Sequence, residues 1–239
     1  MQRRIMLAVS LALALVNGAY AQVTVSAEAV NNATVQPAGP RSGNAGKNFF
    51  NVEGNNKGQY ASFGVADFSA SSFGLSLPVA DITGIRLVLI EDRASFSTAG
   101  GINIWLSEDT TTDIEPVTSP LAWDASDLPN GLGSQLVPRH YLGSGTYTPT
   151  ADGTVFSYTL SLTPNAKSYL ISQLNSAGAI RIVVSPADDD VAATYVGYSH
   201  SSLAGPTLEL DVVPVPEPAS LTAVAMGVLG ILWRKRRTA

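Results

Sequence analysis

The stretch Ile82-Thr-Gly-Ile-Arg-Leu-Val-Leu-Ile-Glu91 decides the fold class of this chain. Successive side chains of a β-strand point to opposite faces, so alternate positions of this stretch form two sets. One set holds Ile85, Leu87 and Leu89, and the other holds Arg86, Val88 and Ile90. An aliphatic face opposite a mixed face predicts a central strand of an antiparallel sheet.

Shorter alternating stretches, separated by Gly, Ser, Asn, Asp and Pro, predict further strands on both sides. These strands are expected near residues 48–52, 60–67, 102–106, 155–162, 180–184, 194–198 and 207–213. In the last of them, the alternation places Leu208, Leu210 and Val212 toward the core.

One helix is predicted over residues 164–175. Thr163 suits the N-cap, Pro164 suits the first helical position, and Gly178 is expected to close the end. Its apolar stripe consists of Tyr169, Leu170, Ile171 and Leu174. Residues 122–149 are rich in Gly, Pro and Asp and are predicted to form long loops. This order of elements predicts an all-β fold, a jelly-roll-like antiparallel β-sandwich with one short helix.

The amino-terminal end predicts export. Arg3 and Arg4 precede an apolar run over residues 5–16, and the small residues Ala19 and Ala21 mark a cleavage site. This pattern is typical of a secretory signal peptide, so the mature chain is expected to begin at Gln22. A retained amino-terminal helix is the alternative.

The carboxy-terminal end predicts a single transmembrane helix. Pro216, Glu217 and Pro218 precede an uncharged apolar run over residues 219–233, which would rise roughly 22 Å as a helix, a thin span. The run is followed by four cations, Arg234, Lys235, Arg236 and Arg237. Such a basic cluster marks the cytoplasmic side of a membrane, which leaves the body of the chain outside. An ordinary anchor that stays attached is one interpretation of this segment.

The same three-part segment resembles the PEP-CTERM sorting signal of bacterial surface proteins. The resemblance implies that Pro216 to Pro218 is recognised by an exosortase, a membrane transpeptidase, and that Arg234 to Arg237 retains the chain until it is processed. The chain is then divided into a signal peptide at 1–21, an extracellular domain at 22–213 and a sorting segment at 214–239. Residues 155–213, with their Pro206-Thr-Leu-Glu-Leu ending, also resemble DNRLRE-type and carbohydrate-binding sandwiches.

The predicted extracellular domain is acidic. It holds 8 Lys and Arg against 18 Asp and Glu, a balance of −10. Since nucleic-acid binding depends on neutralising phosphates with Lys and Arg, no nucleic-acid partner is expected. The chain has no cysteine, which excludes a disulfide framework and thiolate chemistry.

No motif for catalysis is present, and the chain is predicted not to be an enzyme. The two histidines, His140 and His200, are expected to be solvated, and the sequence has no nucleophile elbow, zincin or P-loop pattern. Two carboxylates brought together by the fold would still suit a glycosidase, because those residues need no local spacing. A secreted hydrolase is therefore the least favoured of the functional classes.

Acidic residues and loop aromatics are the candidate binding residues. Carboxylates in a loop suit Ca²⁺, so Asp188, Asp189 and Asp190 form a candidate calcium site, and Glu108, Asp109 and Asp113 form a second one. The aromatics considered for stacking on sugars are Trp105, Trp123, Tyr141, Tyr147, Tyr195 and Tyr198. Trp105 and Tyr195 lie in predicted strands, which favours core or cross-strand roles, whereas Trp123 and Tyr147 lie in predicted loops and are the candidate glycan contacts.

Two functions from different classes remain. The first is an exported surface or extracellular-matrix protein, held in the membrane until an exosortase processes it. The second is a carbohydrate-binding module for extracellular polysaccharide. The expected partners are the secretion machinery, the exosortase, the membrane and, in the second case, a polysaccharide.

Overall fold

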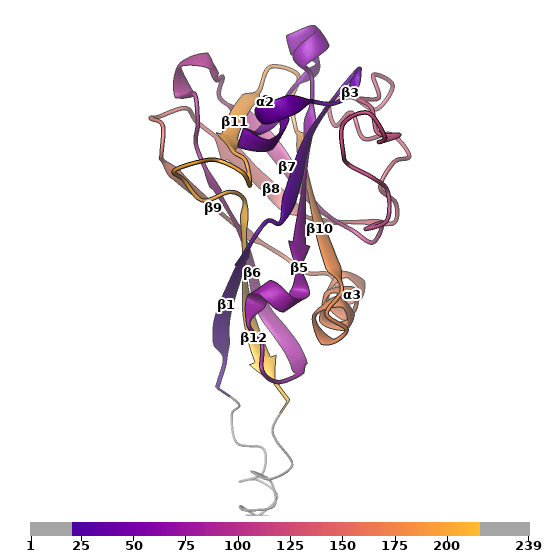
Figure 1. Ribbon diagram of the computed structural model, residues 1–239, viewed down its shortest axis with the longest axis vertical. Coiled ribbons are helices and arrows are strands. Elements are labelled where there is room, and N and C mark those ends of the chain that lie inside the picture. The colour runs from indigo at the N-terminus through magenta and orange to yellow at the C-terminus, as the bar shows by residue number, and fades with distance from the viewer. Residues whose placement is uncertain (1–20, 216–239) are drawn as a thin grey trace, which may run out of the picture.

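The computed structural model describes residues 21–215, which fold into an antiparallel β-sandwich (Figure 1). Most of the predicted signal peptide, the Pro216 to Pro218 triplet, the apolar run and the basic cluster Arg234 to Arg237 lie outside the described residues. Within residues 21–215, no helix has the length and apolar character needed to cross a membrane.

The described chain is built mainly of strands. In chain order the elements are β1 (Val23–Glu28), β2 (Asn31–Gln36), β3 (Gly39–Pro40), α2 (Gly43–Asn48), β4 (Phe49–Glu53), η1 (Asn55–Tyr60), β5 (Phe63–Ser69), η2 (Ala70–Phe73), β6 (Val79–Ile90), η3 (Ala94–Phe96), β7 (Gly100–Ser107), β8 (Arg139–Tyr147), β9 (Val155–Leu160), α3 (Pro164–Asn175), β10 (Ala179–Pro186), β11 (Ala192–Val196) and β12 (Thr207–Pro214).

Two sheets form the sandwich. The first has the order β1-β12-β6-β9 and the second the order β3-β2-β5-β10-β7-β8, while β4 and β11 form a separate pair. β6 lies between β12 and β9, so the central strand predicted from the stretch that ends at Glu91 is confirmed. Ile85, Leu87 and Leu89 are buried, whereas the alternate residues are only partly buried. Leu208, Leu210 and Val212 of β12 also face the core, as predicted.

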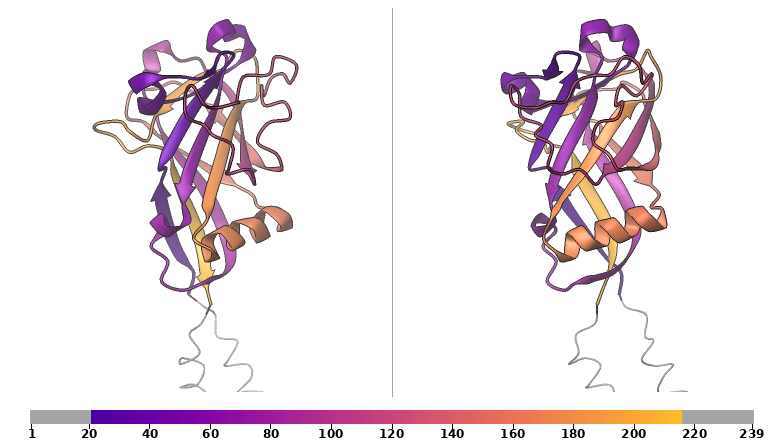
Figure 2. Two further views of the ribbon diagram at one scale, coloured as in Figure 1. Left: turned by 45° about the vertical axis from the view of Figure 1, so that its right-hand side comes forward. Right: turned by 90° about the vertical axis from the view of Figure 1, so that its right-hand side faces the viewer.

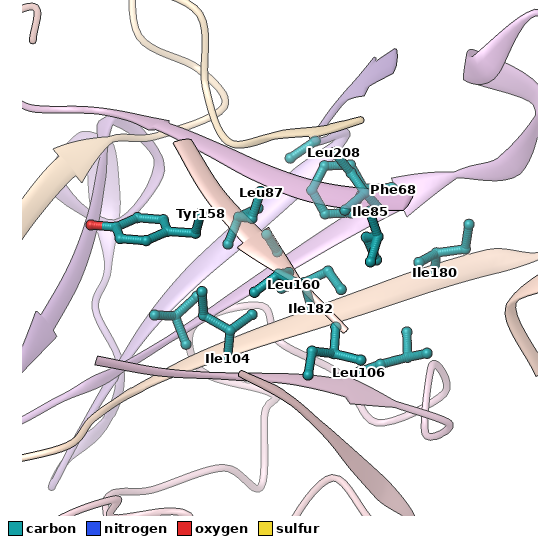
Figure 3. Close-up of a cluster of buried hydrophobic side chains, with 14 of the residues drawn as sticks. Phe68, Ile85, Leu87, Ile104, Leu106, Tyr158, Leu160, Ile180, Ile182 and Leu208 are labelled. Atoms are coloured by element: carbon teal, nitrogen blue, oxygen red, sulfur yellow. The ribbon is translucent and has the colours of Figure 1, made fainter. Parts of the chain in front are cut away.

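The main core lies between the two sheets. Leu87 of β6 and Leu208 of β12 come from the first sheet, and Phe68, Ile104 and Ile182 come from the second (Figure 3). Each of these side chains has no exposed surface. Burying one such side chain contributes about 1.5–3 kcal/mol, so this interdigitated layer supplies much of the stability that the chain needs without disulfides.

A second core covers the outer face of the second sheet. Residues 108–138, between β7 and β8, lie over β2, β5 and β10 (Figure 2). Their apolar side chains pack on Phe63 and Val65 of β5 and on Val183 of β10. The loop contributes Ile114, Leu121, Trp123, Leu132 and Leu136. This second layer explains why β10 is buried on both faces, in contrast to a strand with one side in water.

The helix is confirmed at the predicted residues, with one difference at its end. The Thr163 hydroxyl accepts a 3.3 Å hydrogen bond from the Ala166 amide, which is the expected cap. The left-handed residue after the helix is Ala177, with a φ of 53°, and not Gly178. Gly178 instead donates its amide to the Gln173 carbonyl. Lys167 on this helix forms a surface ion pair with Asp81 of β6.

The prediction of loops throughout residues 122–149 is wrong over β8. Residues 139–147 pair with β7, and a bulge lies between Ile104 and Trp105 of that strand. Glycines gave this stretch the composition of a loop, but Gly145 has a structural role here. A Cβ atom on Gly145 would lie 2.2 Å from the Tyr158 ring, so only glycine permits this approach of β8 to β9. β1 and β2 were not predicted, and β11 ends at Val196, two residues before the predicted end.

Candidate functional site

Trp123 and Tyr147, the predicted glycan contacts, are both buried, so this prediction is wrong. Trp123 is 7% exposed and Tyr147 is 0% exposed. The Trp123 ring is covered by Gly131, where a Cβ atom would lie 2.1 Å from the ring, and it belongs to the second core. Neither ring offers a face to a sugar.

Tyr147 instead forms a hydrogen bond with a buried carboxylate. Its hydroxyl donates a 2.6 Å hydrogen bond to Glu91, which has no exposed surface. The other Glu91 oxygen accepts from the Thr150 hydroxyl at 2.8 Å and from the Ala151 amide at 3.1 Å. Burial raises the pKa of Tyr147 well above its usual range, and the hydrogen bond to Glu91 raises it further. The phenol therefore stays protonated and keeps donating at neutral pH.

A second buried tyrosine pair lies beside this carboxylate. The hydroxyl groups of Tyr158 and Tyr195 are 2.8 Å apart, and the Tyr147 and Tyr195 rings meet edge to face with centroids 5.4 Å apart. Burial raises the pKa of Tyr158 to about 12 and that of Tyr195 well above its usual value. Through Tyr195, these contacts join β9 of the first sheet and β8 of the second sheet to β11.

A partly exposed aromatic pair lies on the outer face of β7 and β8, with Trp105 packed against the second core. Trp105 and Tyr141 are cross-strand neighbours, with ring centroids 5.0 Å apart in an edge arrangement. Tyr141 is 46% exposed, and the Arg139 guanidinium lies 5.9 Å from the Trp105 ring centre. The cross-strand role expected of Trp105 is confirmed.

Polar side chains hold the Trp105 ring in place. The Trp105 indole donates to the Ser185 hydroxyl at 3.1 Å, and that hydroxyl donates to Asn130 at 3.1 Å. Asn103 donates to the same Asn130 oxygen. We call Asn103, Trp105, Arg139 and Tyr141 the outer aromatic patch. The alternation of Trp105 with apolar residues in the sequence indicated that its side chain points outward. The patch was still missed, because β8, which carries Arg139 and Tyr141, was predicted to be a loop.

The predicted calcium ligands at Asp188 to Asp190 form a hydrogen-bonded turn. One oxygen of Asp188 accepts from the Gly101 amide at 2.6 Å, and the other accepts from the Val191 amide at 2.8 Å. Asp190 accepts from the Asn56 side chain at 2.8 Å. Over residues 21–215, no group of three or more His, Cys, Asp and Glu side chains is placed to hold a metal ion. The calcium site has no support in this geometry and stays a prediction.

The acidic residues of the second candidate site point to separate partners. Burial acts to raise the pKa of Asp109, but hydrogen bonds from Thr112 and Thr111 outweigh it and lower that pKa to about 2. Asp113 accepts from the Glu115 amide at 2.8 Å. Glu108 pairs with His140. Each carboxylate thus stabilises its own part of the loop.

The two histidines are not simply solvated, in contrast to the prediction. His140 Nε2 lies 2.7 Å from Glu108 Oε1, and the His140 side chain is 15% exposed. His200 Nε2 lies 3.8 Å from a carboxylate oxygen of Asp92. The other ring nitrogen of His200 accepts from the Ser202 and Leu203 amides, which assigns this histidine to a turn.

The carboxy-terminal segment, which begins at the last residue of β12, is similar to a known sorting signal. Residues 214–237 match the PEP-CTERM protein-sorting motif, which confirms the resemblance drawn from the sequence. The match covers this segment alone and says nothing about the sandwich. No curated protein matches the chain. The likeness of the body to DNRLRE-type and carbohydrate-binding domains therefore stays a prediction.

Proposed function

We propose that the protein is an exported surface or extracellular-matrix component whose carboxy-terminal segment is processed by an exosortase. The match to the PEP-CTERM motif over residues 214–237 is the observation that carries this proposal. Pro216, Glu217 and Pro218 are then the recognition triplet, and Arg234 to Arg237 are the retention cluster. The signal peptide predicted at 1–21 supplies the export that this sorting requires.

The fold supports sorting because it ends where the motif begins. β12 runs to Pro214, and the Val215 amide still donates a 2.7 Å hydrogen bond to the Pro78 carbonyl. The first residue of the recognition triplet follows directly. An exosortase that acts near Pro216 therefore works at the edge of the folded domain, with no intervening linker.

Mass spectrometry of the protein from its own host tests this proposal. We expect the surface form to lack the apolar run and the basic cluster. Glu217→Ala, or deletion of Arg234 to Arg237, should leave an uncut form in the membrane, whereas Glu28→Ala in exposed β1 should be processed as the wild type. Recovery of an intact carboxy terminus through Ala239 would contradict the proposal and favour a simple anchor.

For the fold, we infer a jelly roll, and the strand pairing supports this description. Besides the hairpin β2–β3 and the pair β4–β11, eight strands remain in the two sheets. The first of them pairs with the last, the second with the seventh, the third with the sixth and the fourth with the fifth. These pairs are β1–β12, β5–β10, β6–β9 and β7–β8. Nested pairing of this kind is what two Greek keys produce in a jelly roll.

The second candidate function is carbohydrate binding, with the outer aromatic patch as its site. Tyr141 offers an exposed ring beside Trp105, and Arg139 and Asn103 supply polar groups on the same face. Aromatic rings beside fixed polar groups are the usual composition of a ligand site. A glycan array tests this candidate. We expect Tyr141→Ala to abolish a saturable signal and Tyr60→Ala, which removes another exposed ring, to leave it unchanged.

A further inference from the structure

Two arginines share one phenylalanine ring at the end of the molecule that carries α2. Phe49 directly follows α2, and its ring is half-buried. The Arg41 guanidinium carbon lies 5.7 Å from the ring centre, and the Arg93 guanidinium carbon lies 5.2 Å from it. Each cation is attracted to the ring, but the two cations repel each other.

The donors of these two arginines have no acceptor in the described part of the chain. The other three arginines within residues 21–215 are engaged: Arg86 with Glu209 and Asp211, Arg139 with loop carbonyls, and Arg181 with Asp67. In the same range, neither Arg41 nor Arg93 donates a side-chain hydrogen bond to a protein atom. The Arg93 Nε atom is 4.0 Å from Asp92, which is too far for a hydrogen bond.

Further features gather at this place. Lys47 is exposed in the last turn of α2, and it lines the same small hollow as Arg41, together with Glu115. Arg93 has a φ of 59°, a left-handed conformation that is uncommon outside glycine and clusters at binding sites. Arg41, Lys47 and Arg93 thus lie at one end of the domain, with Asp92 and Glu115 beside them.

The position of this surface suits a partner outside the cell. α2 lies at the end of the sandwich opposite to the start of β1 and the end of β12 (Figure 1). The sorting motif begins at residue 214, at the end of β12. Whatever holds the chain by that motif therefore leaves the Arg41 and Arg93 side chains on the far end.

We propose that Arg41, Lys47, Phe49 and Arg93, which we call the arginine surface, bind a polysaccharide that carries carboxylate groups. A planar guanidinium with free donors matches a carboxylate through two parallel hydrogen bonds. The Phe49 ring positions both guanidinium groups, so each one is held ready to bind a carboxylate of the polymer. The arginine surface holds three cations, too few for a nucleic acid, whose binding depends on neutralising many phosphates. This inference is independent of exosortase processing and of the outer aromatic patch.

Binding of the full-length chain in a neutral detergent to immobilised polygalacturonate tests the inference, with uncharged dextran as the comparison polymer. We expect the chain to bind polygalacturonate and not to bind dextran. The double variant Arg41→Gln with Arg93→Gln should bind roughly tenfold more weakly or worse, because hydrogen bonds to charged groups are lost. Two variants should bind as the wild type: Lys167→Gln, which removes a cation elsewhere, and Tyr141→Ala, which alters the outer aromatic patch.

A charge-conserving variant tests whether binding needs the guanidinium geometry or only the positive charge. Arg41→Lys with Arg93→Lys keeps both cations but loses the guanidinium forks, so we expect several-fold weaker binding. All these chains share Arg234 to Arg237, so any binding by that cluster cancels in the comparison. The inference is overturned if the glutamine variant binds like the wild type with an unchanged melting temperature. It is equally overturned if duplex DNA binds the wild type as tightly as polygalacturonate does.

Discussion

The Tyr147 hydroxyl donates a 2.6 Å hydrogen bond to a carboxylate oxygen of Glu91, and neither residue has exposed surface. Glu91 follows β6 of the first sheet, while Tyr147 ends β8 of the second sheet. This bond therefore joins the two layers of the sandwich at a point where a carboxyl group interrupts the apolar core. Buried carboxylates are costly unless their acceptors are filled, so the stability of the domain depends on this contact.

Tyr147→Phe removes the donor and leaves the buried Glu91 oxygen without that partner. We expect the free energy of unfolding to fall by about 1–3 kcal/mol, the usual cost of an unsatisfied buried group. Urea denaturation measures the change. The matched variant Tyr60→Phe alters a phenol that is 55% exposed, and it should leave stability unchanged. Equal stability of the two variants would mean that Glu91 finds another donor.

Breaking the buried ion pair between Arg181 and Asp67 should lower the free energy of unfolding more than Tyr147→Phe does. Arg181 Nε lies 2.6 Å from Asp67, and the same guanidinium donates to the Asp109 and Thr112 carbonyls. Asp67→Ala leaves a buried arginine without its carboxylate, so we expect a loss of about 3–5 kcal/mol. The control Asp81→Ala breaks the more exposed pair with Lys167 and should cost less than about 1 kcal/mol. Similar losses in both variants would contradict this assignment.

The depressed pKa of Asp109 predicts sensitivity to acid. Its folded pKa is about 2, below the ordinary value of an aspartate. The ionised form is therefore favoured by folding, and this contribution is complete above the unfolded pKa and is lost as the pH falls through the folded one. We expect the stability difference between the wild type and Asp109→Asn to shrink between about pH 4 and pH 2. Unfolding curves across that range measure it, and a constant difference would argue against the depressed pKa.

Calcium binding at Asp188, Asp189 and Asp190 is tested by thermal unfolding with calcium and with a chelator. A ligand that binds only the folded state raises the melting temperature. Because both oxygens of Asp188 already accept from backbone amides, we expect no change. A rise with calcium that Asp190→Asn abolishes would establish the predicted site instead.

The domain boundary also makes a prediction. Pro214 still pairs with Val79, and the Val215 amide bonds to Pro78, so the folded unit continues two residues beyond the predicted end at 213. We expect residues 22–215 to give a soluble monomer with a β-type circular dichroism spectrum. The version ending at Val213 should unfold at a lower temperature, because it lacks these contacts. A helix-rich spectrum would contradict the fold.

The sequence predicted those parts of the fold that depend on local pattern. The stretch ending at Glu91 has a period of two, and Thr163 with Pro164 marks the start of a helix, so both elements were found at or near their observed residues. The sorting motif was recognisable for a similar reason, since its three parts are adjacent in the chain. Its recognition requires no knowledge of tertiary contacts.

The parts that were mispredicted depend on contacts between distant residues. Trp123 and Tyr147 lie in stretches with the composition of loops, yet one packs beneath Gly131 in the second core and the other bonds to Glu91. Nothing local distinguishes a loop that covers a sheet from one that extends into water. Likewise, the convergence of Arg41 and Arg93 on Phe49 joins segments separated by more than one strand.

The position of β12 between β1 and β6 has a mechanical consequence. Consider a force applied between the carboxy terminus of the domain and its opposite end. Such a force acts along β12. The hydrogen bonds to both neighbours then carry the load side by side in shear and must rupture together, whereas an edge strand peels one bond at a time. Since forced unfolding is governed by the rate of unfolding, this geometry makes the protein resistant to being pulled apart under flow or traction.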